Sequence, residues 1–195
     1  MQVERADAAR NRQTILDAAD ELFALADAPA SVSMDDIARV AGVGKGTLFR
    51  RFGDRTNLIR QVYAARISPL RAQIESGPPP LGPATPPLER IAAIIDAIAR
   101  VKFENVHLMA ALEGGAAGAS GSLFNSPDYN DVHLLLSDLI NLHKKTTHAR
   151  WTAHVLLGCV RADLLRHLAE VEGMTHRQIR SQLQEFVRST VSSCN

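Results

Sequence analysis

Apolar residues recur at intervals of three and four along nearly the whole chain, which is the spacing of one face of an α-helix. Ile15, Ala19 and Phe23 form such a stripe near the start, and Ile179 and Leu183 belong to another near the end. No segment shows the alternation of apolar and polar residues that a half-buried strand requires. The sequence therefore predicts an all-α fold.

Two segments interrupt this periodicity. The stretch from Ser76 to Pro87 has proline at six of its twelve positions, so neither a helix nor a central strand can continue through it. The stretch from Glu113 to Asp131 is rich in glycine and serine and predicts a long loop. Beyond it, the pattern predicts helices over 132–145, 149–173 and 175–191.

Bulk composition points to no class of partner, because the net charge is only +1. The charge is unevenly placed, however. Residues 1–38 carry three basic and eight acidic side chains, a balance of −5, whereas residues 39–60 carry six basic and one acidic, a balance of +5. A local basic segment of this kind matters more for polyanion binding than the total charge.

The chain has two cysteines, Cys159 and Cys194, which imply no disulfide framework and fit a reducing compartment. No apolar secretory segment stands at the N-terminus, and no apolar run approaches the roughly 18 residues of a membrane span. We therefore predict a cytoplasmic protein with no membrane partner.

The stretch AGVGKGTLFRRFGDR, Ala41 to Arg55, combines glycines, a lysine and a threonine with several arginines. A nucleotide-binding loop of the P-loop type needs a serine or threonine directly after its lysine, and a strand before it. Here Gly46 follows Lys45, and the preceding segment is helical in pattern. The stretch is therefore a poor match to a phosphate-binding loop for nucleotides.

The same stretch agrees better with a helix-turn-helix. Ser33 and Asp36 predict a capping box for a helix from about Met34 to Ala41, and a Gly-Val-Gly turn would follow it. A second helix, from about Lys45 to Phe52, would bury Leu48 and Phe52. Its other side would present Lys45, Thr47, Arg50 and Arg51. A short helix with one apolar and one basic side suits the DNA major groove; a merely solvated basic face is the alternative.

The segments ILDAADELF and SMDDIARVAGVGKGTLFRRFGDRTNL resemble the TetR family of transcriptional regulators over about residues 10–62. The resemblance implies a three-helix DNA-binding domain over residues 1–54 and a larger helical domain for ligand binding and dimerisation over residues 55–195. It implies a homodimer on a palindromic double-stranded operator, with a small-molecule ligand that releases the DNA.

By position in the family pattern, Lys45 matches the main base-contacting residue and Ser33 a phosphate contact. Phe49 stands where the family usually has a tyrosine whose hydroxyl holds a phosphate, so that hydrogen bond is missing here. The full set of expected DNA contacts is Ser33, Lys45, Gly46, Thr47, Phe49, Arg50, Arg51 and Arg55.

The second half of the sequence is less informative. The candidate ligand-pocket residues are Phe103, His107, Met109, Phe124, Tyr129, Trp151 and His154, each of which could instead be an ordinary core or surface residue. The candidate dimer-interface residues are Val155, Leu156, Val160, Leu164, Leu168, Ile179, Leu183 and Phe186, which could instead complete the core of a single chain.

We predict no metal site and no cofactor, because no set of side chains stands at metal-ligand spacing. The leading hypothesis is a sequence-specific DNA-binding regulator, a repressor released by a small molecule. A DNA-binding regulator without such a ligand, with a vestigial pocket or a protein partner, is the alternative within the same class. A small helical enzyme is a further alternative that no visible nucleophile–base pair supports.

Overall fold

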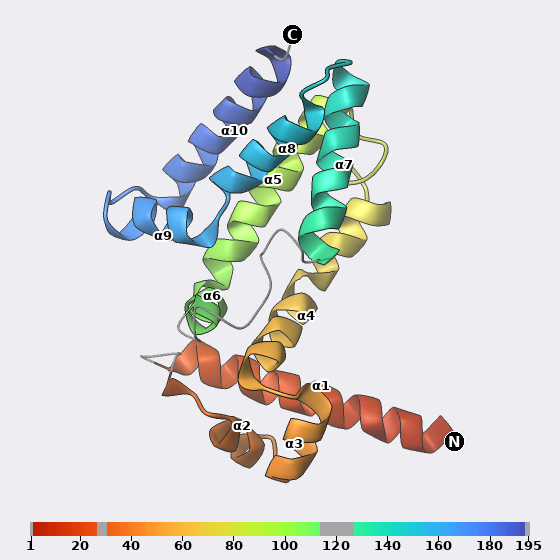
Figure 1. Cartoon of the computed structure of the whole chain (residues 1–195), viewed down its shortest axis with the longest axis vertical. Helices are drawn as coiled ribbons and strands as arrows, with labels where there is room; N and C mark the ends of the chain where they lie inside the picture. Colours follow the sequence, from red (N-terminus) through yellow and green to blue (C-terminus); the bar gives the residue numbers. More distant parts are fainter. Residues whose placement is uncertain (1, 27–30, 114–126, 194–195) are drawn as a thin grey trace. The chain divides into compact units, whose positions relative to one another are not determined.

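The computed structural model describes residues 2–26, 31–113 and 127–193. These residues form helices and connecting segments and contain no strand, which confirms the all-α prediction (Figure 1). In chain order the helices are α1 (Gln2–Leu25), α2 (Met34–Val40), α3 (Lys45–Phe52), α4 (Arg55–Ser76), α5 (Pro87–Glu104), α6 (Val106–Glu113), α7 (Pro127–His143), α8 (Ala149–Cys159), α9 (Ala162–Glu170) and α10 (His176–Ser193).

The chain divides into two compact units, each with its own apolar core. The first comprises the residues up to Ser68 together with α6, and the second comprises residues 69–104 and the helices from α7 onward. Helix α4 therefore contributes to both units, and Pro69 stands in its interior where the division falls. The boundary between domains that the family resemblance implies, after residue 54, stays a prediction.

The core of the first unit is built from the apolar stripes of α1 to α4 and one residue of α6. Ile15 and Phe23 of α1, Ile37 of α2 and Leu58 of α4 are all completely buried. Leu108 of α6 joins the same core. Burial in this core stabilises α2 and α3, because helices of seven and eight residues are too short to be stable alone in water.

The core of the second unit lies among α5, α7, α8 and α10. In Figure 1, α5 (green) runs alongside α7 and α10, and α8 packs against α7 and α10. Ile91, Ile95, Leu136, Leu156 and Val187 from these four helices are at most 1% exposed and belong to one continuous cluster. Among the described residues, no helix of either unit is long and apolar enough to cross a membrane.

The proline-rich connector folds back on itself within the second unit. Arg90, only 8% exposed, donates from Nε to the Leu81 carbonyl at 2.9 Å and from an Nη atom to the Ile74 carbonyl at 2.7 Å. The Ile74 carbonyl lies in the last turn of α4, where no intrahelical N–H reaches it. Arg90 thus caps one helix and fixes the connector that follows it.

Two of the predicted elements are wrong in extent. The loop predicted over Glu113–Asp131 falls largely on residues 114–126, which lie outside the described part of the chain, but its end is already helical because α7 begins at Pro127. Proline is favoured at the first position of a helix, where its missing N–H has no partner to lose. The sequence before Pro127 is rich in glycine and serine, so its pattern does not indicate that a helix begins there.

The helix predicted over 149–173 is in fact two helices. Arg161 has an extended backbone between α8 and α9, and its guanidinium makes two hydrogen bonds with Asp163 in the first turn of α9. Lys102 of α5 donates from Nζ to the Val160 carbonyl at the end of α8, at 2.5 Å, and burial lowers the pKa of this lysine to about 8. These contacts stabilise a break that the continuous apolar stripe does not reveal.

Candidate nucleic-acid interface

The segment from α2 to α3 is a helix-turn-helix with the boundaries that the sequence predicts. Helix α2 ends at Val40, and Gly42 has a φ of 65°, a left-handed conformation that glycine adopts without steric cost. The N–H of Val43 then bonds to the Ala38 carbonyl at 3.0 Å and closes the turn. Helix α3 begins at Lys45 and ends before Gly53, which has a φ of 73°.

Helix α3 has one buried edge. Leu48 is 0% and Phe52 is 1% exposed, and both belong to the core that α1, α2 and α4 share. The residues on its other sides are exposed (Lys45, Gly46, Phe49 and Arg50) or half-buried (Thr47 and Arg51). The apolar edge therefore fixes the helix on the first unit while its basic side faces outward, as the sequence predicts.

The start of α3 is open to approach from outside. A methyl group placed on Gly44 or Gly46 would meet no atom within 4 Å, so packing inside the chain does not require glycine at either position. Because neither glycine has a side chain, the backbone N–H groups in the first turn of the helix are not covered at these two positions. Backbone N–H groups at a helix N-terminus favour a negatively charged partner such as phosphate.

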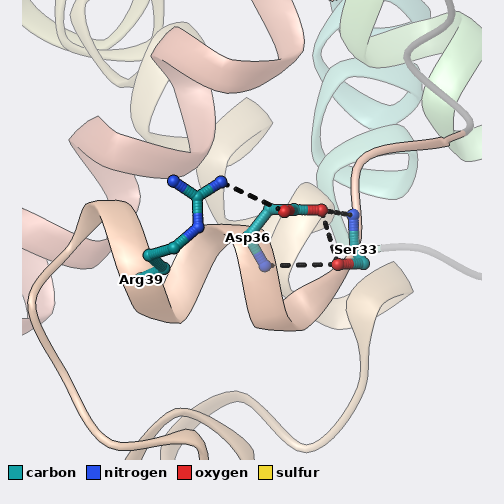
Figure 2. Close-up of polar contacts among 3 residues, drawn as sticks. All are labelled: Ser33, Asp36 and Arg39. Carbon is teal, nitrogen blue, oxygen red and sulfur yellow. Dashed lines mark hydrogen bonds and ion pairs between the residues drawn. The ribbon is translucent and has the colours of Figure 1, made fainter.

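Ser33 and Asp36 form the predicted capping box at the start of α2 (Figure 2). The Asp36 N–H donates to the Ser33 hydroxyl at 3.2 Å, and the Ser33 N–H donates to the Asp36 carboxylate, also at 3.2 Å. The Ser33 hydroxyl itself donates to that carboxylate at 2.6 Å. Hydrogen bonds from Ser33 and from Arg39 favour the ionised carboxylate and lower the pKa of Asp36.

This arrangement bears on the phosphate contact predicted for Ser33. A serine hydroxyl has one hydrogen to donate, and here Asp36 receives it. A phosphate oxygen can accept from this hydroxyl only if the hydroxyl turns away from Asp36. The capping role is confirmed, whereas the phosphate contact stays a prediction.

Lys45, the expected base-contacting residue, lies between an acid and an aromatic ring. Its Nζ is 2.7 Å and 2.8 Å from the two carboxylate oxygens of Asp35 in α2. The same nitrogen is 6.0 Å from the centre of the Phe49 ring, at the outer limit of a cation–π contact. Phe49 lacks a hydroxyl for a phosphate, but its ring, 40% exposed, packs beside the lysine.

Arg55, predicted to contact phosphate, has contacts inside the first unit. Its Nε donates to the Val32 carbonyl at 2.8 Å, and its guanidinium lies 5.4 Å from the centre of the Phe23 ring. Partial burial lowers the pKa of this guanidinium. The side chain therefore links α4 to α1 and to the segment before α2, a role that its position in the family pattern does not indicate.

Comparison with known proteins agrees with this geometry. Residues 15–62 match the model of the N-terminal domain of bacterial regulatory proteins of the tetR family. An HTH-type transcriptional regulator of Staphylococcus aureus, SAR0097, is 25% identical over 186 residues, which cover 94% of this chain and 95% of that protein. The repressor LfrR of Mycolicibacterium smegmatis is 39% identical over 82 residues, 42% of each chain.

Residues 15–62 belong to the DNA-binding domain of the TetR family. The chain is a DNA-binding transcriptional regulator, as the relatives and the helix-turn-helix together show.

Solved structures of the family share the fold of the whole chain. A putative TetR-family regulator of Syntrophomonas wolfei has a TM-score of 0.68 at 17% identity, covering 95% of this chain and 97% of that one. NalD of Pseudomonas aeruginosa, a secondary repressor of a multidrug efflux pump, has a TM-score of 0.63 at 17% identity, covering 93% and 95%. At this identity the likeness concerns the fold alone.

The residues predicted for the ligand pocket are divided between the two units of the chain. His107 and Met109 of α6 belong to the first, where Met109 packs on the core and His107 Nε2 is 3.8 Å from Asp20 Oδ1. Phe103, Tyr129, Trp151 and His154 belong to the second, and Phe124 lies outside the described residues. No one unit therefore holds the whole predicted set.

Two of these residues meet in a small aromatic cluster between α7 and α8. The Tyr129 hydroxyl is 2.6 Å from His154 Nδ1. The ring of His133, buried at 4% exposure, stacks on that of His154 at 3.8 Å and donates from Nε2 to the Arg150 carbonyl at 3.0 Å. Sequence reasoning missed His133, although its spacing of four residues from Tyr129 places both on one helix face.

The other pocket candidates have different surroundings. Trp151 is 70% exposed on α8, and Phe103 stacks on His176 with ring centres 3.9 Å apart. A surface cavity of about 350 Å³ lies between α1 and α4 in the first unit, lined by Asp20, Val62 and Arg66 among others. None of the described pocket candidates lines it. The predicted pocket therefore stays a prediction.

The residues predicted for the dimer interface differ in exposure. Leu156, Val160, Ile179 and Leu183 are buried in the core of the second unit, while Val155 and Leu168 are half-buried. Leu164 of α9 and Phe186 of α10 are 39% and 41% exposed. Of the predicted set, these last two have the most surface available to a second chain.

Proposed function

We propose that this chain is a repressor that binds a palindromic operator as a homodimer and leaves it when a small molecule binds. DNA binding is supported by the way α3 is held in the first unit. Its apolar edge, Leu48 and Phe52, is buried, and Lys45 and Arg50 are exposed. The repressor role is supported by LfrR and NalD, both of which are named repressors. A regulator of this kind needs no catalytic centre, so we propose that the chain is not an enzyme.

Lys45 is proposed to donate to the O6 and N7 acceptors of a guanine, the commonest specific contact of a basic side chain. Lys45→Ala is then expected to lower the discrimination at one base position of the operator by about 1–3 kcal/mol. The measurement compares binding to all four bases at each position of a duplex that the wild-type protein has selected from a random library.

Lys145→Ala serves as the matched control, because Lys145 is exposed in the segment after α7, far along the chain from the helix-turn-helix. It removes the same charge and is expected to leave the base preference unchanged. A loss of affinity for Lys45→Ala that is equal on every sequence would contradict base contact and would make Lys45 a phosphate contact only.

The homodimer is proposed to use α9 and α10, where Leu164 and Phe186 are exposed. Two such apolar side chains on each of two symmetric copies would bury one another across an isologous interface. The double variant Leu164→Glu, Phe186→Glu is expected to sediment as one chain of 21.2 kDa, whereas the wild-type protein sediments as two. Leu142→Glu, at a 74% exposed position of α7, is the control and should stay dimeric. A wild-type protein that sediments as a single chain would overturn the proposal.

A regulator without a small-molecule ligand is the second candidate. The exposure of Trp151, 70%, favours it, because an exposed tryptophan does not line an enclosed ligand pocket. The two candidates are separated by a panel of small apolar and amphipathic compounds. A compound that raises the Tm of the protein and also dissociates the selected duplex supports release by a ligand, and stabilisation without dissociation contradicts it.

A further inference from the structure

Asp35 is the acidic residue that pairs with Lys45, the expected base-contacting residue. Asp35 stands in the first turn of α2, ten residues before Lys45, and both of its carboxylate oxygens lie within 2.8 Å of the lysine Nζ. Both side chains are more than 60% exposed. The pair therefore lies on the outer surface of the helix-turn-helix, where a negative charge opposes the approach of DNA.

Asp35 is not needed for the local fold in the way that its neighbour is. The Asp36 carboxylate closes the capping box with Ser33 and accepts from Arg39, as Figure 2 shows. The capping box does not include Asp35, whose contacts with Lys45 bridge α2 and α3. An acid in the first turn of a helix adds only a modest stabilisation through the helix dipole.

We infer that Asp35 is a specificity-determining residue, which restrains Lys45 from contacting the DNA backbone and so weakens binding to non-operator sequences. The inference rests on the DNA-binding function of the chain. An ammonium group has three hydrogens to donate. The two carboxylate oxygens engage two of these hydrogens. The third can still be shared between the O6 and N7 acceptors of a guanine while Lys45 stays paired with Asp35.

Binding to a non-operator sequence has a different consequence for the pair. There the guanine acceptors are absent, and Lys45 gains a partner on the DNA only by turning to a phosphate. That turn breaks the ion pair and leaves the Asp35 carboxylate unpaired beside the negatively charged backbone. Asp35 thus disfavours the sequence-independent mode more than the operator mode, which is specificity by penalising the wrong partner.

The experiment measures the affinity and its salt dependence on two duplexes. One is the duplex that wild-type protein selects from a random library, and the other is a scrambled duplex of the same length and composition. Asp35→Asn keeps the shape of the side chain and removes its charge. Glu21→Gln is the matched control, because Glu21 is an exposed acid of the same unit on α1.

Asp35→Asn is expected to tighten binding to the scrambled duplex about two- to fivefold, the range of an exposed ion pair. The slope of log K against log salt on that duplex should steepen by about 0.9, because Lys45 becomes one additional phosphate contact. Binding to the selected duplex should change less, so the ratio of the two affinities falls. Glu21→Gln should change neither slope.

A second set of variants separates this restraint from a simple loss of negative charge. In a Lys45→Ala background, Asp35→Asn should no longer steepen the salt slope, because no lysine is left to release. A slope change that persists without Lys45 would overturn the inference, and so would an equal gain on both duplexes. If the wild-type protein selects no sequence at all, it is the proposed sequence-specific function that fails, before Asp35 is tested.

Discussion

Phe52→Ala is expected to lower the free energy of unfolding of the first unit by about 3–5 kcal/mol and to abolish operator binding. Phe52 is the last residue of α3 and is 1% exposed in a core with residues of α1, α2 and α4. Truncating a buried phenylalanine removes its apolar contacts and leaves a cavity. Because a helix of eight residues is not stable alone in water, α3 loses its fixed position when this anchor is removed.

Phe49→Ala provides the matched control for stability, since it changes the same residue type in the same helix at a position that is 40% exposed. Urea unfolding followed by circular dichroism should show a much smaller destabilisation for Phe49→Ala than for Phe52→Ala. Equal destabilisation of the two variants, or operator binding retained by Phe52→Ala, would contradict the anchoring role.

Arg90→Met is expected to lower the free energy of unfolding of the second unit by about 3–6 kcal/mol. The substitution keeps an apolar side chain of similar length but removes the hydrogen bonds to the Leu81 and Ile74 carbonyls. Breaking hydrogen bonds to a charged donor costs about 1.5–3 kcal/mol each, and a buried carbonyl left without a donor adds to the loss. The end of α4 and the proline-rich connector are both affected.

Arg100→Met is the control for Arg90→Met, because Arg100 is an exposed arginine on the same helix, α5. Arg90→Lys should be intermediate, since one ammonium group lacks the fork that reaches both carbonyls. If Arg90→Met were no less stable than Arg100→Met in urea, Arg90 would have no role in holding the connector.

Local signals in the sequence were sufficient for the helix-turn-helix. The capping box at Ser33, the glycine at position 42 and the apolar pair Leu48 and Phe52 act over a few residues, and each has the predicted structure. The break at Arg161 was missed for the opposite reason. It depends on Lys102, which is distant in the sequence and donates to the carbonyl of Val160.

The same distinction applies to the functional residues. The family pattern assigns Lys45 and Arg55 to the DNA-binding surface. It does not show that Lys45 pairs with Asp35. Nor does it show that Arg55 donates to the Val32 carbonyl. The pocket residues are harder still, because an aromatic side chain at helical spacing fits a core as well as a ligand site. Only packing separates Trp151, which is exposed, from His133, which is buried.

The central claim is that α3 recognises a particular DNA sequence, and selection from a random duplex library by the wild-type protein tests it most directly. We expect one enriched motif made of two inverted half-sites, with centres about one helical turn or a multiple of it apart. Enriched duplexes should lose affinity when the base contacted by Lys45 is changed. Recovery of bound duplexes with the same base composition at every position as the starting library would contradict the claim.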